Sequence, residues 1–586
     1  MPTLDWIGKD KVVNHHLDVP FRVLDRKYSF DGVHGQQTED NGSENMIIHG
    51  DNLEALKALL PKYEGKIDCI YIDPPYNTAH STSDNQRWVY SDNVDDPHIK
   101  AWLNKVVGDE GIDFSRHDKW LCMMYPRLKL LQRLLSKNGV IFISLDDNEI
   151  HNLKHICDEI FGSNCFVARI TWNNNYSLRN DANGIPYETD NICIYSKSPN
   201  WSPNRLPRTE EMNQRYVNYD NDLRQYKVTP IHATGASSHK NMVYAIQHPI
   251  TGELMYPPRG RHWKDSQEKL LEYLNQWAPY ELKVIDDIRI RESICGNAVD
   301  PNTPAIMLSC NLEEAATRAR ERYNNKPWPK YFFLAKGLGS LQSKTYLDPS
   351  KGKVVSTLWR HEDVGTNVEA TNELKKILSG SSLFDNPKPV RLLDRVIQIA
   401  TGKNSIILDS FAGSGTTAHA VLKRNNEDGG TRKFILVELM DYADSITAER
   451  VKRVISGYGE EKKTVEGTGG SFCFYELGPS LMVGDYLNEE VGIERIREYI
   501  YYTETKTSLS ESNPNEPSYM GTHAHTAYYF NYTPDAATTL NHDFLETIRT
   551  KADSYVIYAD RCTLSKAELE RFRIIFKKIP RDITRF

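Results

Sequence analysis

The stretch "IILDSFAGSGTT" (Ile406–Thr417) indicates the fold class, because it combines a strand, an acidic residue, a glycine-rich turn and the start of a helix. Such a turn lets the backbone approach a ligand closely and directs helix N–H groups toward a negative group. The stretch lacks the full GxGxxG spacing of a dinucleotide site, and the Gly-Lys-Ser/Thr run of a Walker A loop is missing. On its own, it also fits a tight strand-to-helix connection that binds no ligand.

Two acidic residues beside this turn suggest which ligand it binds. Asp409 ends the strand, where its carboxylate could bind an ammonium group. Glu438 ends the next strand, "FILVEL", at a position where carboxylates commonly bind ribose hydroxyls. A ligand with an amino group, a carboxylate and a ribose fits S-adenosylmethionine, which becomes S-adenosylhomocysteine once its methyl group has been transferred.

A second motif, "YIDPPYNT" (71–78), ends another strand and suggests the reaction. The exocyclic amine of adenine is a poor nucleophile, because its lone pair is delocalised into the ring. The Asp73 carboxylate and the Pro74 carbonyl could accept its two N–H bonds while charge develops on the nitrogen. Pro74 and Pro75 stiffen the loop, and Tyr76 could stack on a base that has left the duplex. The methyl group would then pass in line to the nitrogen, without a covalent enzyme intermediate.

Strand and helix signals alternate on both sides of a long irregular middle region. "MIIHGDN", "IDCIYIDPP" and "VIFISLD" are typical of strands, whereas "LEALKALLPKY" and "WLCMMYPRLKLLQRLLSKNG" are typical of helices. The nearly continuous apolar character of "VIFISLD" is expected of a parallel strand that is covered on both faces. We therefore predict an α/β fold with a doubly wound, Rossmann-like sheet, interrupted by an inserted domain and followed by a small α+β C-terminal module.

The composition argues against several classes of protein. The 586 residues carry a formal net charge of -7, so any nucleic-acid surface must be a local patch. The nine cysteines form no CxxC pair, which indicates neither a disulfide framework nor a zinc site. No 18-residue apolar run and no signal-peptide core occur. We expect a cytoplasmic protein without membrane contact and without a metal of its own.

The two motifs resemble those of a known enzyme family. "DPPY" and "FAGSGTT" are similar to the catalytic and cofactor motifs of amino-methyltransferases that act on DNA, and their order resembles the beta class of adenine methyltransferases. "IIHGDNLEAL", "GVIFISLDDNEI", "HPITGELMYPPRGRHW" and "NPKPVRLLDRVIQIAT" resemble segments of the modification subunit of type III restriction–modification systems. The likeness covers most of residues 45–460 and recurs near "SYVIYADR" and "FKKIPRDITRF". The segment "LMDYADSITAERVKR" is shorter than the family pattern.

The resemblance implies roles for individual residues. The catalytic motif is matched by Asp73, Pro74, Pro75 and Tyr76. The cofactor-binding residues would be Asp51, Asn52, Asp73, Lys388, Asp409, Phe411, Ala412, Gly413, Gly415, Thr416, Thr417 and Glu438. Among these, Asp51 matches a position near the cofactor adenine, and Lys388 belongs to a "KP" segment that precedes the cofactor half. Asp146 and Asp147 end another strand, where they either line the same edge or cap a helix.

The resemblance also divides the chain into five segments. Residues 1–45 are expected to form an N-terminal arm and linker, 46–170 the catalytic half, 171–360 a target-recognition domain, 361–475 the cofactor half and 476–586 a C-terminal module for partner or dimer contacts. Residues 171–360 hold 25 Lys and Arg against 20 Asp and Glu, whereas the remaining chain holds 47 against 59. The inserted domain is thus the locally basic part, as a DNA-contacting surface requires.

Residues expected to face DNA follow from residue type alone. Arginine and lysine side chains pair with phosphates, while amides and aromatic rings can meet bases. The candidates are Trp172, Asn173, Arg179, Arg259, Arg261, Trp263 and Lys264. For any one of them, a solvated surface group or a packed aromatic ring is the simpler interpretation.

These observations favour a site-specific DNA adenine methyltransferase that protects host DNA in a restriction–modification system of a bacterial or archaeal cell, associated with the nucleoid. An N4-cytosine methyltransferase usually carries Ser in place of Asp73, so adenine is favoured. A stand-alone methyltransferase and a non-catalytic DNA specificity subunit are the other interpretations. Because no helicase or nuclease motif is evident, the resemblance implies a separate helicase–nuclease restriction subunit, double-stranded DNA as substrate and a homodimer.

Overall fold

The computed structural model describes residues 3–77, 116–176, 185–217, 219–380, 384–459, 464–509 and 515–581. They form two compact units. The first combines Met1–Asn204 with Val355–Phe586, and the second is the inserted stretch Arg205–Val354. The residues of both predicted motifs lie in the first unit.

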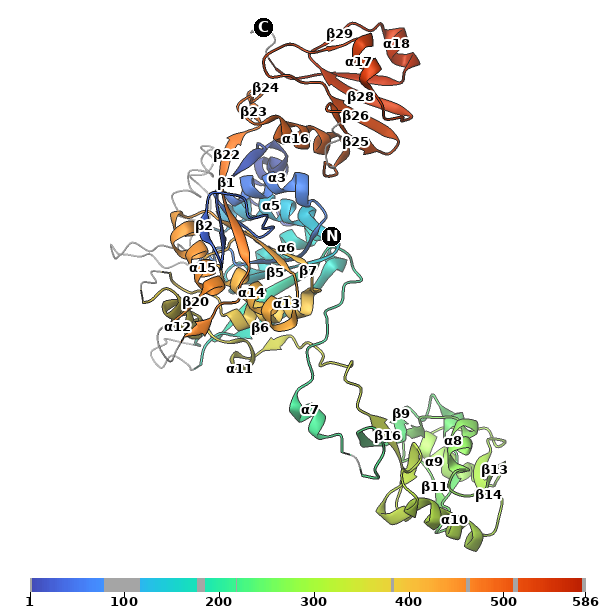
Figure 1. Ribbon diagram of the computed structural model, residues 1–586. Helices are drawn as coiled ribbons and strands as arrows, with labels where there is room; N and C mark the ends of the chain where they lie inside the picture. The colour runs from blue at the N-terminus through green and yellow to red at the C-terminus, as the bar shows by residue number, and fades with distance from the viewer. Residues whose placement is uncertain are drawn as a thin grey trace. The chain divides into compact units, whose positions relative to one another are not determined.

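Within the described residues, an 11-stranded sheet organises the first unit (Figure 1). Its order is β17 (Leu358–Trp359), β6 (Phe166–Asn173), β7 (Thr189–Ser196), β5 (Leu135–Leu145), β4 (Ile67–Ile72), β18 (Ile406–Asp409), β19 (Lys433–Glu438), β3 (Met46–His49), β22 (Ser471–Ser480), β1 (Arg22–Asp31) and β2 (Gly35–Gln37). The strands from β5 to β22 pair in parallel, while β7 and β1 pair antiparallel with their neighbours. The predicted doubly wound α/β sheet is confirmed.

The strand order brings the two motifs together. β18 lies between β4 and β19, although more than 300 residues separate it from β4 in the chain. Leu408 pairs with Ile70, so the carboxyl ends of β4 and β18 lie side by side. Ligands of open α/β sheets bind beyond the carboxyl ends of such strands. Asp73 and Asp409 therefore meet at one edge of the sheet.

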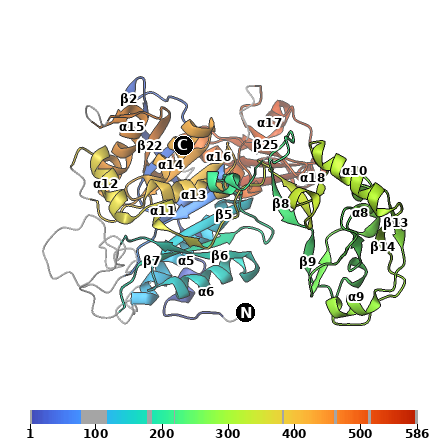
Figure 2. The same ribbon diagram turned by 90° about the horizontal axis from the view of Figure 1, so that it is seen from below.

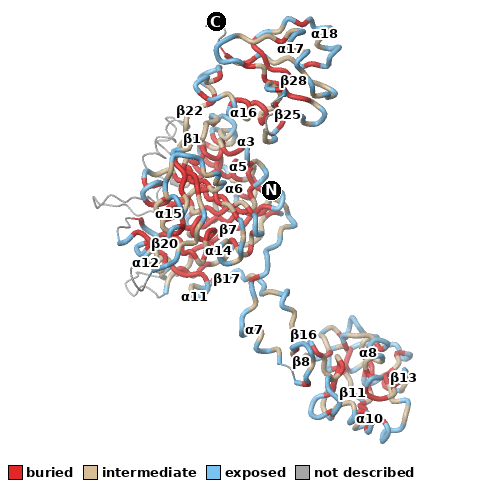
Figure 3. Tube along the Cα trace, in the orientation of Figure 1, coloured by how far each residue is buried: buried red, intermediate tan, exposed pale blue. Residues whose placement is uncertain are grey.

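Helices cover both faces of the sheet. On one face, α3 (Asn52–Tyr63), α5 (Arg116–Leu134) and α6 (Ile150–Phe161) pack on alternate strand residues such as Ile70 and Ile72. The other face carries α13 (Val390–Ala400), α14 (Thr416–Asp428) and α15 (Glu449–Ser456), and Figure 2 shows α13 and α14 opposite α5 and α6. The central strands β4, β18, β19 and β3 are largely buried (Figure 3), as apolar strands between two helical layers should be, whereas β6, β1 and β2 are only partly buried.

The second unit has its own core. One sheet has the order β11 (Leu254–Met255), β10 (Ile246–Gln247), β14 (Ala305–Leu308) and β13 (Tyr280–Lys283). A second has the order β15 (Tyr331–Phe333), β16 (Leu341–Tyr346) and β8 (Tyr226–Pro230). A third pairs β12 (Arg261–Trp263) with β9 (His232–Thr234). Helices α7 (Glu210–Gln214), α8 (Gln267–Leu274), α9 (Ile288–Cys295) and α10 (Leu312–Asn324) complete the unit. Its aromatic side chains, among them Tyr226, Trp277 and Phe333, fill the core.

The C-terminal part of the first unit is a small α+β module, as predicted. Its sheet has the order β25 (Tyr519–His523), β26 (Thr526–Phe530), β28 (Ser554–Ala559) and β30 (Ile574–Lys578), with α16 (Ile493–Thr505), α17 (His542–Thr547) and α18 (Lys566–Arg571). Tyr502 on α16 accepts a hydrogen bond of 2.8 Å from Arg133 on α5, which ties the module to the main sheet's helices. In the part of the chain that the structure describes, no helix is long and apolar enough to cross a membrane.

Short elements complete the first unit. They are α1 (Lys9–Val12), α2 (His15–Asp18), α11 (His361–Val364), α12 (Asn367–Ile377), β20 (Gly457–Tyr458), β21 (Val465–Glu466), β23 (Met482–Val483), β24 (Tyr486–Leu487), β27 (Thr539–Leu540) and β29 (Arg561–Cys562). A π-helical turn, Asp444–Ala448, precedes α15.

Several predicted boundaries need correction. The compact inserted unit spans Arg205–Val354 instead of residues 171–360, because β7 completes the main sheet as a neighbour of β5. Residues 1–45 are more than an arm and linker, since β1 within them pairs with β22 from Arg22 to Asp31, with two register shifts. β22 itself crosses the expected boundary at residues 475 and 476. Long-range strand pairing fixes these boundaries, and local composition does not report it.

Candidate active site

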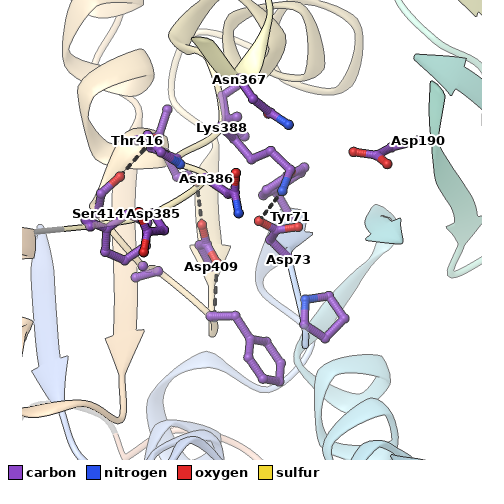
Figure 4. Close-up of a pocket in the computed structure, with 18 of the residues that line it drawn as sticks. Tyr71, Asp73, Asp190, Asn367, Asp385, Asn386, Lys388, Asp409, Ser414 and Thr416 are labelled. Atoms are coloured by element: carbon purple, nitrogen blue, oxygen red, sulfur yellow. Dashed lines mark hydrogen bonds and ion pairs between the residues drawn. The ribbon is translucent and has the colours of Figure 1, made fainter. Parts of the chain in front are cut away.

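One pocket lies at the carboxyl ends of β4 and β18, and both predicted motifs line it (Figure 4). Asp73, Pro74 and Tyr76 come from the loop after β4. Asp409 and the following turn, including Phe411, Ala412, Gly413, Thr416 and Thr417, come from β18 and the start of α14. The segment 384–388 forms a further wall.

The Asp73 carboxylate is held by two side chains. Lys388 Nζ donates to Asp73 Oδ2 at 2.6 Å, and Tyr76 Oη donates to Asp73 Oδ1 at 3.1 Å. The Lys388 ammonium also lies 5.0 Å from the centroid of the Tyr76 ring, within cation–π range. Burial raises the pKa of Tyr76 well above its usual value, so its hydroxyl keeps the proton that it donates. Lys388 thus contacts the catalytic motif, although the resemblance assigned it to the cofactor.

The loop that carries Asp73 is also fixed through its backbone. Trp120 Nε1, on the first turns of α5, donates to the Pro75 carbonyl at 2.8 Å. Within the described residues, no hydrogen-bond donor contacts the Pro74 carbonyl oxygen. The loop therefore presents a carboxylate and a carbonyl acceptor to the same pocket.

The Asp409 carboxylate is buried behind the glycine-rich turn. It accepts from the Phe411 N–H at 3.1 Å and from Thr417 Oγ1 at 2.5 Å. Glu438 accepts from the N–H groups of Gly413 at 2.7 Å and Met440 at 3.1 Å. Burial raises the pKa of Asp409 to about 7 and that of Glu438 to about 7. A cationic ligand group would favour the ionised form of Asp409.

Two glycines give the turn its shape. Gly413 and Gly415 have φ angles of 52° and 77°, in the left-handed region that glycine adopts without a steric penalty. A Cβ atom at Gly415 would lie 3.0 Å from the Thr447 carbonyl oxygen. Thr447 Oγ1, on the π-helical turn, donates to the Gly413 carbonyl at 2.6 Å. The turn is therefore packed from behind and leaves its other side to the pocket.

A buried guanidinium supports the same turn. Arg450 Nη1 donates to Ser414 Oγ at 2.9 Å and to Thr416 Oγ1 at 2.7 Å. Burial lowers the pKa of Arg450 to about 10, which leaves the group cationic at neutral pH. This positive charge adds to the positive end of the α14 dipole.

Asp51 and Asn52 lie at the same edge of the sheet but outside the pocket lining. Asp51 caps α3 by accepting from the N–H groups of Leu53 at 2.8 Å and Glu54 at 3.3 Å. Asn52 donates to the Ser410 carbonyl at 3.1 Å. Asn52 therefore fixes the backbone next to Asp409 instead of facing a ligand.

Sequence reasoning missed Asp190, which lines the pocket with Asn174 (Figure 4). Burial is the larger effect and raises the pKa of Asp190 to about 6, although the nearby positive charge of Lys388 opposes part of this rise. β7 is antiparallel to β5, so its first residues lie where the parallel strands end. In the sequence, an acid at the start of a predicted strand is a hint to it, but the antiparallel direction that brings it into the pocket comes from strand pairing. Asp146 and Asp147, by contrast, lie in the turn before α6, where Asp147 accepts from Asn191 at 2.8 Å.

Two of the expected DNA-contacting residues are core residues. Trp172 is buried and donates from Nε1 to the Gly365 carbonyl at 3.1 Å. Trp263 is buried and donates to the Tyr244 carbonyl at 2.8 Å. The expectation that these two rings contact DNA is wrong, because each fills a hydrophobic core and has its N–H bonded there. Asn173 is partly buried and donates to the Glu188 carbonyl at 3.2 Å.

The basic candidates of the second unit are at its surface. Arg259, Arg261 and Lys264 are exposed. Arg261 Nη1 lies 3.2 Å from His232 Nδ1, and Lys264 Nζ donates to the Pro230 carbonyl at 2.7 Å. Arg179 lies outside the described residues. Across the described part of the chain, no group of three or more His, Cys, Asp or Glu residues is placed to hold a metal ion.

Comparisons with known proteins agree on one family. The DNA methylase family model matches residues 67–504. The StyLTI Mod subunit of a type III restriction–modification enzyme from Salmonella typhimurium is 30% identical over 475 residues, which cover 77% of this chain and 62% of that protein. The EcoPI Mod subunit of Escherichia phage P1 is 31% identical over 74% of this chain and 63% of that protein. The chain thus spans less than two thirds of the length of these relatives.

Other relatives are shorter or more distant. The type II methyltransferase M.KpnI of Klebsiella pneumoniae is 29% identical over 70% of this chain and 84% of that protein. Among solved structures, the cytosine-N4-specific PvuII DNA methyltransferase matches 70% of this chain and 86% of that chain, at 12% identity and a TM-score of 0.31. A DNA modification methylase of Thermus thermophilus, complexed with S-adenosyl-L-methionine, matches 70% of this chain and 95% of that chain, at 12% identity and a TM-score of 0.29.

Proposed function

The chain belongs to the DNA methylase family, and on this basis we propose that it transfers the methyl group of S-adenosylmethionine to the exocyclic amine of an adenine in DNA. The observation that carries the proposal is the meeting of Asp73 and Asp409 in one pocket, at the ends of neighbouring parallel strands. Asp73 suits an amine that must become nucleophilic, and Asp409 suits the ammonium group of the methyl donor.

The residues around Asp409 fit the methyl donor. Its buried carboxylate would pair with the ammonium group. Glu438, expected to bind the ribose, lies outside the pocket lining and would support the turn by accepting from the Gly413 and Met440 N–H groups. The positive end of α14, reinforced by Arg450, suits the donor's carboxylate. When bound, S-adenosylmethionine supplies an electrophilic methyl group on a sulfonium sulfur. The loop with Gly413 and Gly415 lets the backbone approach it closely.

The residues around Asp73 would prepare the amine. Asp73 and the Pro74 carbonyl accept its two N–H bonds, which favours a pyramidal nitrogen with its lone pair directed outward. Positive charge grows on that nitrogen as its bond to the methyl carbon forms and the carbon–sulfur bond breaks, and the Asp73 carboxylate would stabilise this charge. The nitrogen then loses one proton to solvent, which leaves the neutral methylated amine and S-adenosylhomocysteine. Lys388 and Tyr76 hold the carboxylate in one orientation, so little reorganisation is needed. The Tyr76 ring can stack on a base extruded from the duplex.

We further propose that the chain is the modification component of a type III restriction–modification system, supported by its similarity to the StyLTI and EcoPI Mod subunits. Its partners would be double-stranded DNA, a second copy of the chain and a helicase–nuclease restriction subunit. The inserted unit, Arg205–Val354, would recognise the target sequence. The match to the type II methyltransferase M.KpnI covers 84% of that protein, which favours a second candidate, a methyltransferase that acts without a restriction partner.

Base-modification sequencing tests the proposal. DNA is taken from cells that lack other methyltransferases and express either the wild-type chain or Asp73→Ala. We expect methyladenine in one short motif with the wild type and none with the variant. Methylation of only one strand of an asymmetric motif supports the type III system. Methylcytosine in place of methyladenine would contradict the proposed base, and no modification by a cofactor-binding chain would contradict the reaction.

A further inference from the structure

A fully buried carboxylate, Glu149, lies behind the loop that carries Asp73 and outside the pocket lining. It is the residue before α6 and has 0% of its surface exposed. Its Oε1 accepts from Asn77 Nδ2 at 2.5 Å and lies 2.6 Å from His117 Nδ1. Its Oε2 accepts from Asn152 Nδ2 at 2.7 Å. A buried carboxylate needs such partners, because desolvation strongly disfavours a bare charge.

Asn77 is the residue through which Glu149 reaches the loop. It follows Tyr76 directly, is fully buried and has a φ angle of 57°. This left-handed region is unfavourable for most side chains and is tolerated best by glycine and asparagine. Asn77 therefore turns the chain sharply just after Tyr76, and its amide is fixed by Glu149.

The five-residue loop is attached to the protein at alternate positions. Asp73 is held by Lys388, the Pro75 carbonyl by Trp120, and Asn77 by Glu149. Between these points, Pro74 and Tyr76 line the pocket, whereas Pro75 and Asn77 do not. The attachments thus set the direction of the Pro74 carbonyl and of the Tyr76 ring, the two groups proposed to receive the base.

Glu149 also connects the loop to α5. His117 lies on the first turn of α5, and Trp120, one turn later, is the residue that binds the Pro75 carbonyl. One carboxylate oxygen therefore holds both Asn77 and the start of the helix that supplies Trp120. Loss of this oxygen would loosen two of the three attachment points at once.

We propose that Glu149 is a positioning residue for methyl transfer, which acts through Asn77 and His117 on the orientation of the Pro74 carbonyl and the Tyr76 ring. The inference rests on the proposed function. It predicts that the pairing between Glu149 and Asn77 controls the rate of the chemical step and leaves cofactor binding unaffected, because no residue of the cofactor turn takes part.

The pairing can be broken and restored by exchanging donor and acceptor. Asn77→Asp places a second carboxylate against Glu149 in a buried site, where like charges are strongly unfavourable. Adding Glu149→Gln gives the opposite arrangement, since one N–H of the new amide donates to the new carboxylate while its oxygen still accepts from Asn152. The second N–H faces His117 Nδ1, which accepts it in the neutral tautomer of the ring, so both attachments are kept. Glu149→Gln alone is milder, because the Asn77 amide can rotate by 180° and present its oxygen.

The experiment uses the purified full-length chain and measures kcat on DNA, the Kd for S-adenosylmethionine and the thermal midpoint. We expect Asn77→Asp to lower kcat by about 100-fold, as a small misplacement of reacting groups does. The double variant should recover to within about tenfold of wild type. The cofactor Kd should stay within about twofold throughout, because the two loops do not share side chains.

Glu159→Gln is the matched control. Glu159 lies on α6, the helix that Glu149 precedes, accepts from Tyr125 at 2.7 Å and Lys9 at 2.9 Å, and makes no hydrogen bond to the Asp73 loop. We expect a lower thermal midpoint with kcat unchanged.

Three results would overturn the inference: Asn77→Asp with wild-type kcat, a double variant no faster than Asn77→Asp, or equal losses of kcat and cofactor affinity. A wild-type chain that binds cofactor but methylates no DNA would overturn the proposed function, and this inference with it.

Discussion

The two loops that meet in the pocket are held in different ways. In the cofactor turn, Asp409 and Glu438 accept from backbone N–H groups of the turn itself, and glycines supply the left-handed backbone. In the catalytic loop, Lys388, Trp120 and Glu149 hold the backbone and side chains from distant parts of the chain. The first loop combines its own glycine backbone with supports such as Thr447 and Arg450 that lie at most 36 residues away, although Asn52 also binds its backbone. The second loop has no such local frame and depends on residues as far away as Lys388.

This difference has a functional consequence. A turn whose glycine backbone sets its shape, with supports mostly from the same half of the sheet, can bind a common donor molecule independently of the base-binding loop. A loop held by several distant side chains can be adjusted for one base without altering the donor site. We therefore expect substitutions in the two loops to affect different kinetic quantities.

The largest effect is expected for Asp73→Ala. Removing the acceptor that polarises the amine should lower methyl transfer by about 1000-fold, since a single transition-state hydrogen-bond partner contributes up to this much. The Kd for S-adenosylmethionine should change little, which equilibrium titration would establish. Asp147→Ala, at the same sheet edge but outside the pocket, is the control and should stay active. A large loss of cofactor affinity in Asp73→Ala would mean that the two loops form one unit.

The sequence predicted the cofactor turn more completely than the catalytic loop. The cofactor turn was found with its strand, glycines and helix, because these signals lie within a short stretch of chain. Its more distant supports, Thr447, Arg450 and Asn52, were not recognised as such. The catalytic motif was also recognised, but its supports were not. Lys388 is 315 residues from Asp73, and sequence spacing gives no sign that they pair. Asp190 was missed because the chain direction of β7 emerges only from strand pairing.

The middle of the chain shows the same limit. Its basic residues were recognised, yet Trp172 and Trp263 were assigned to a DNA surface although both are buried. Where regular periodicity fades, the sequence does not separate a core ring from an exposed one. The inserted unit was foreseen, whereas its edges, at Arg205 and Val354, follow from β6, β7 and β17 joining the main sheet.

The reciprocal substitution is Asp409→Asn. It keeps the volume of the side chain and removes the charge that would pair with the ammonium of the methyl donor. We expect the Kd for S-adenosylmethionine to rise by about 100-fold, in the range for loss of one partner of a buried charge pair. At saturating cofactor, kcat should stay near the wild-type value. A kcat that falls as far as in Asp73→Ala would contradict the separation of the two loops.

The pH dependence of cofactor binding should reflect the ionisation of Asp409. Burial raises the pKa of Asp409 from 3.8 to about 7, so the folded protein holds its proton more tightly than the unfolded chain. The proton on Asp409 stabilises the folded state at low pH, and this stabilisation is lost as the pH rises through 7.

Cofactor affinity changes in the opposite direction. The ammonium of the ligand requires the ionised acid, so affinity should rise by roughly eightfold from pH 6 to 7.5 and then level off. Calorimetry across this range would measure it, and Asp409→Asn should remove the slope.

The smallest effect is expected far from both loops, at Arg261 in the inserted unit. Its exposed guanidinium can neutralise one phosphate, so Arg261→Ala should weaken DNA binding by about fivefold. The slope of log affinity against log salt concentration should become shallower by about one. Cofactor affinity and kcat at saturating DNA should stay unchanged. Trp263→Phe is the control from the same strand, because its buried ring should affect the thermal midpoint and leave the salt slope intact. An unchanged salt slope in Arg261→Ala would exclude this residue from the DNA surface, and a loss of kcat would show that the inserted unit acts on the catalytic loop as well as on DNA.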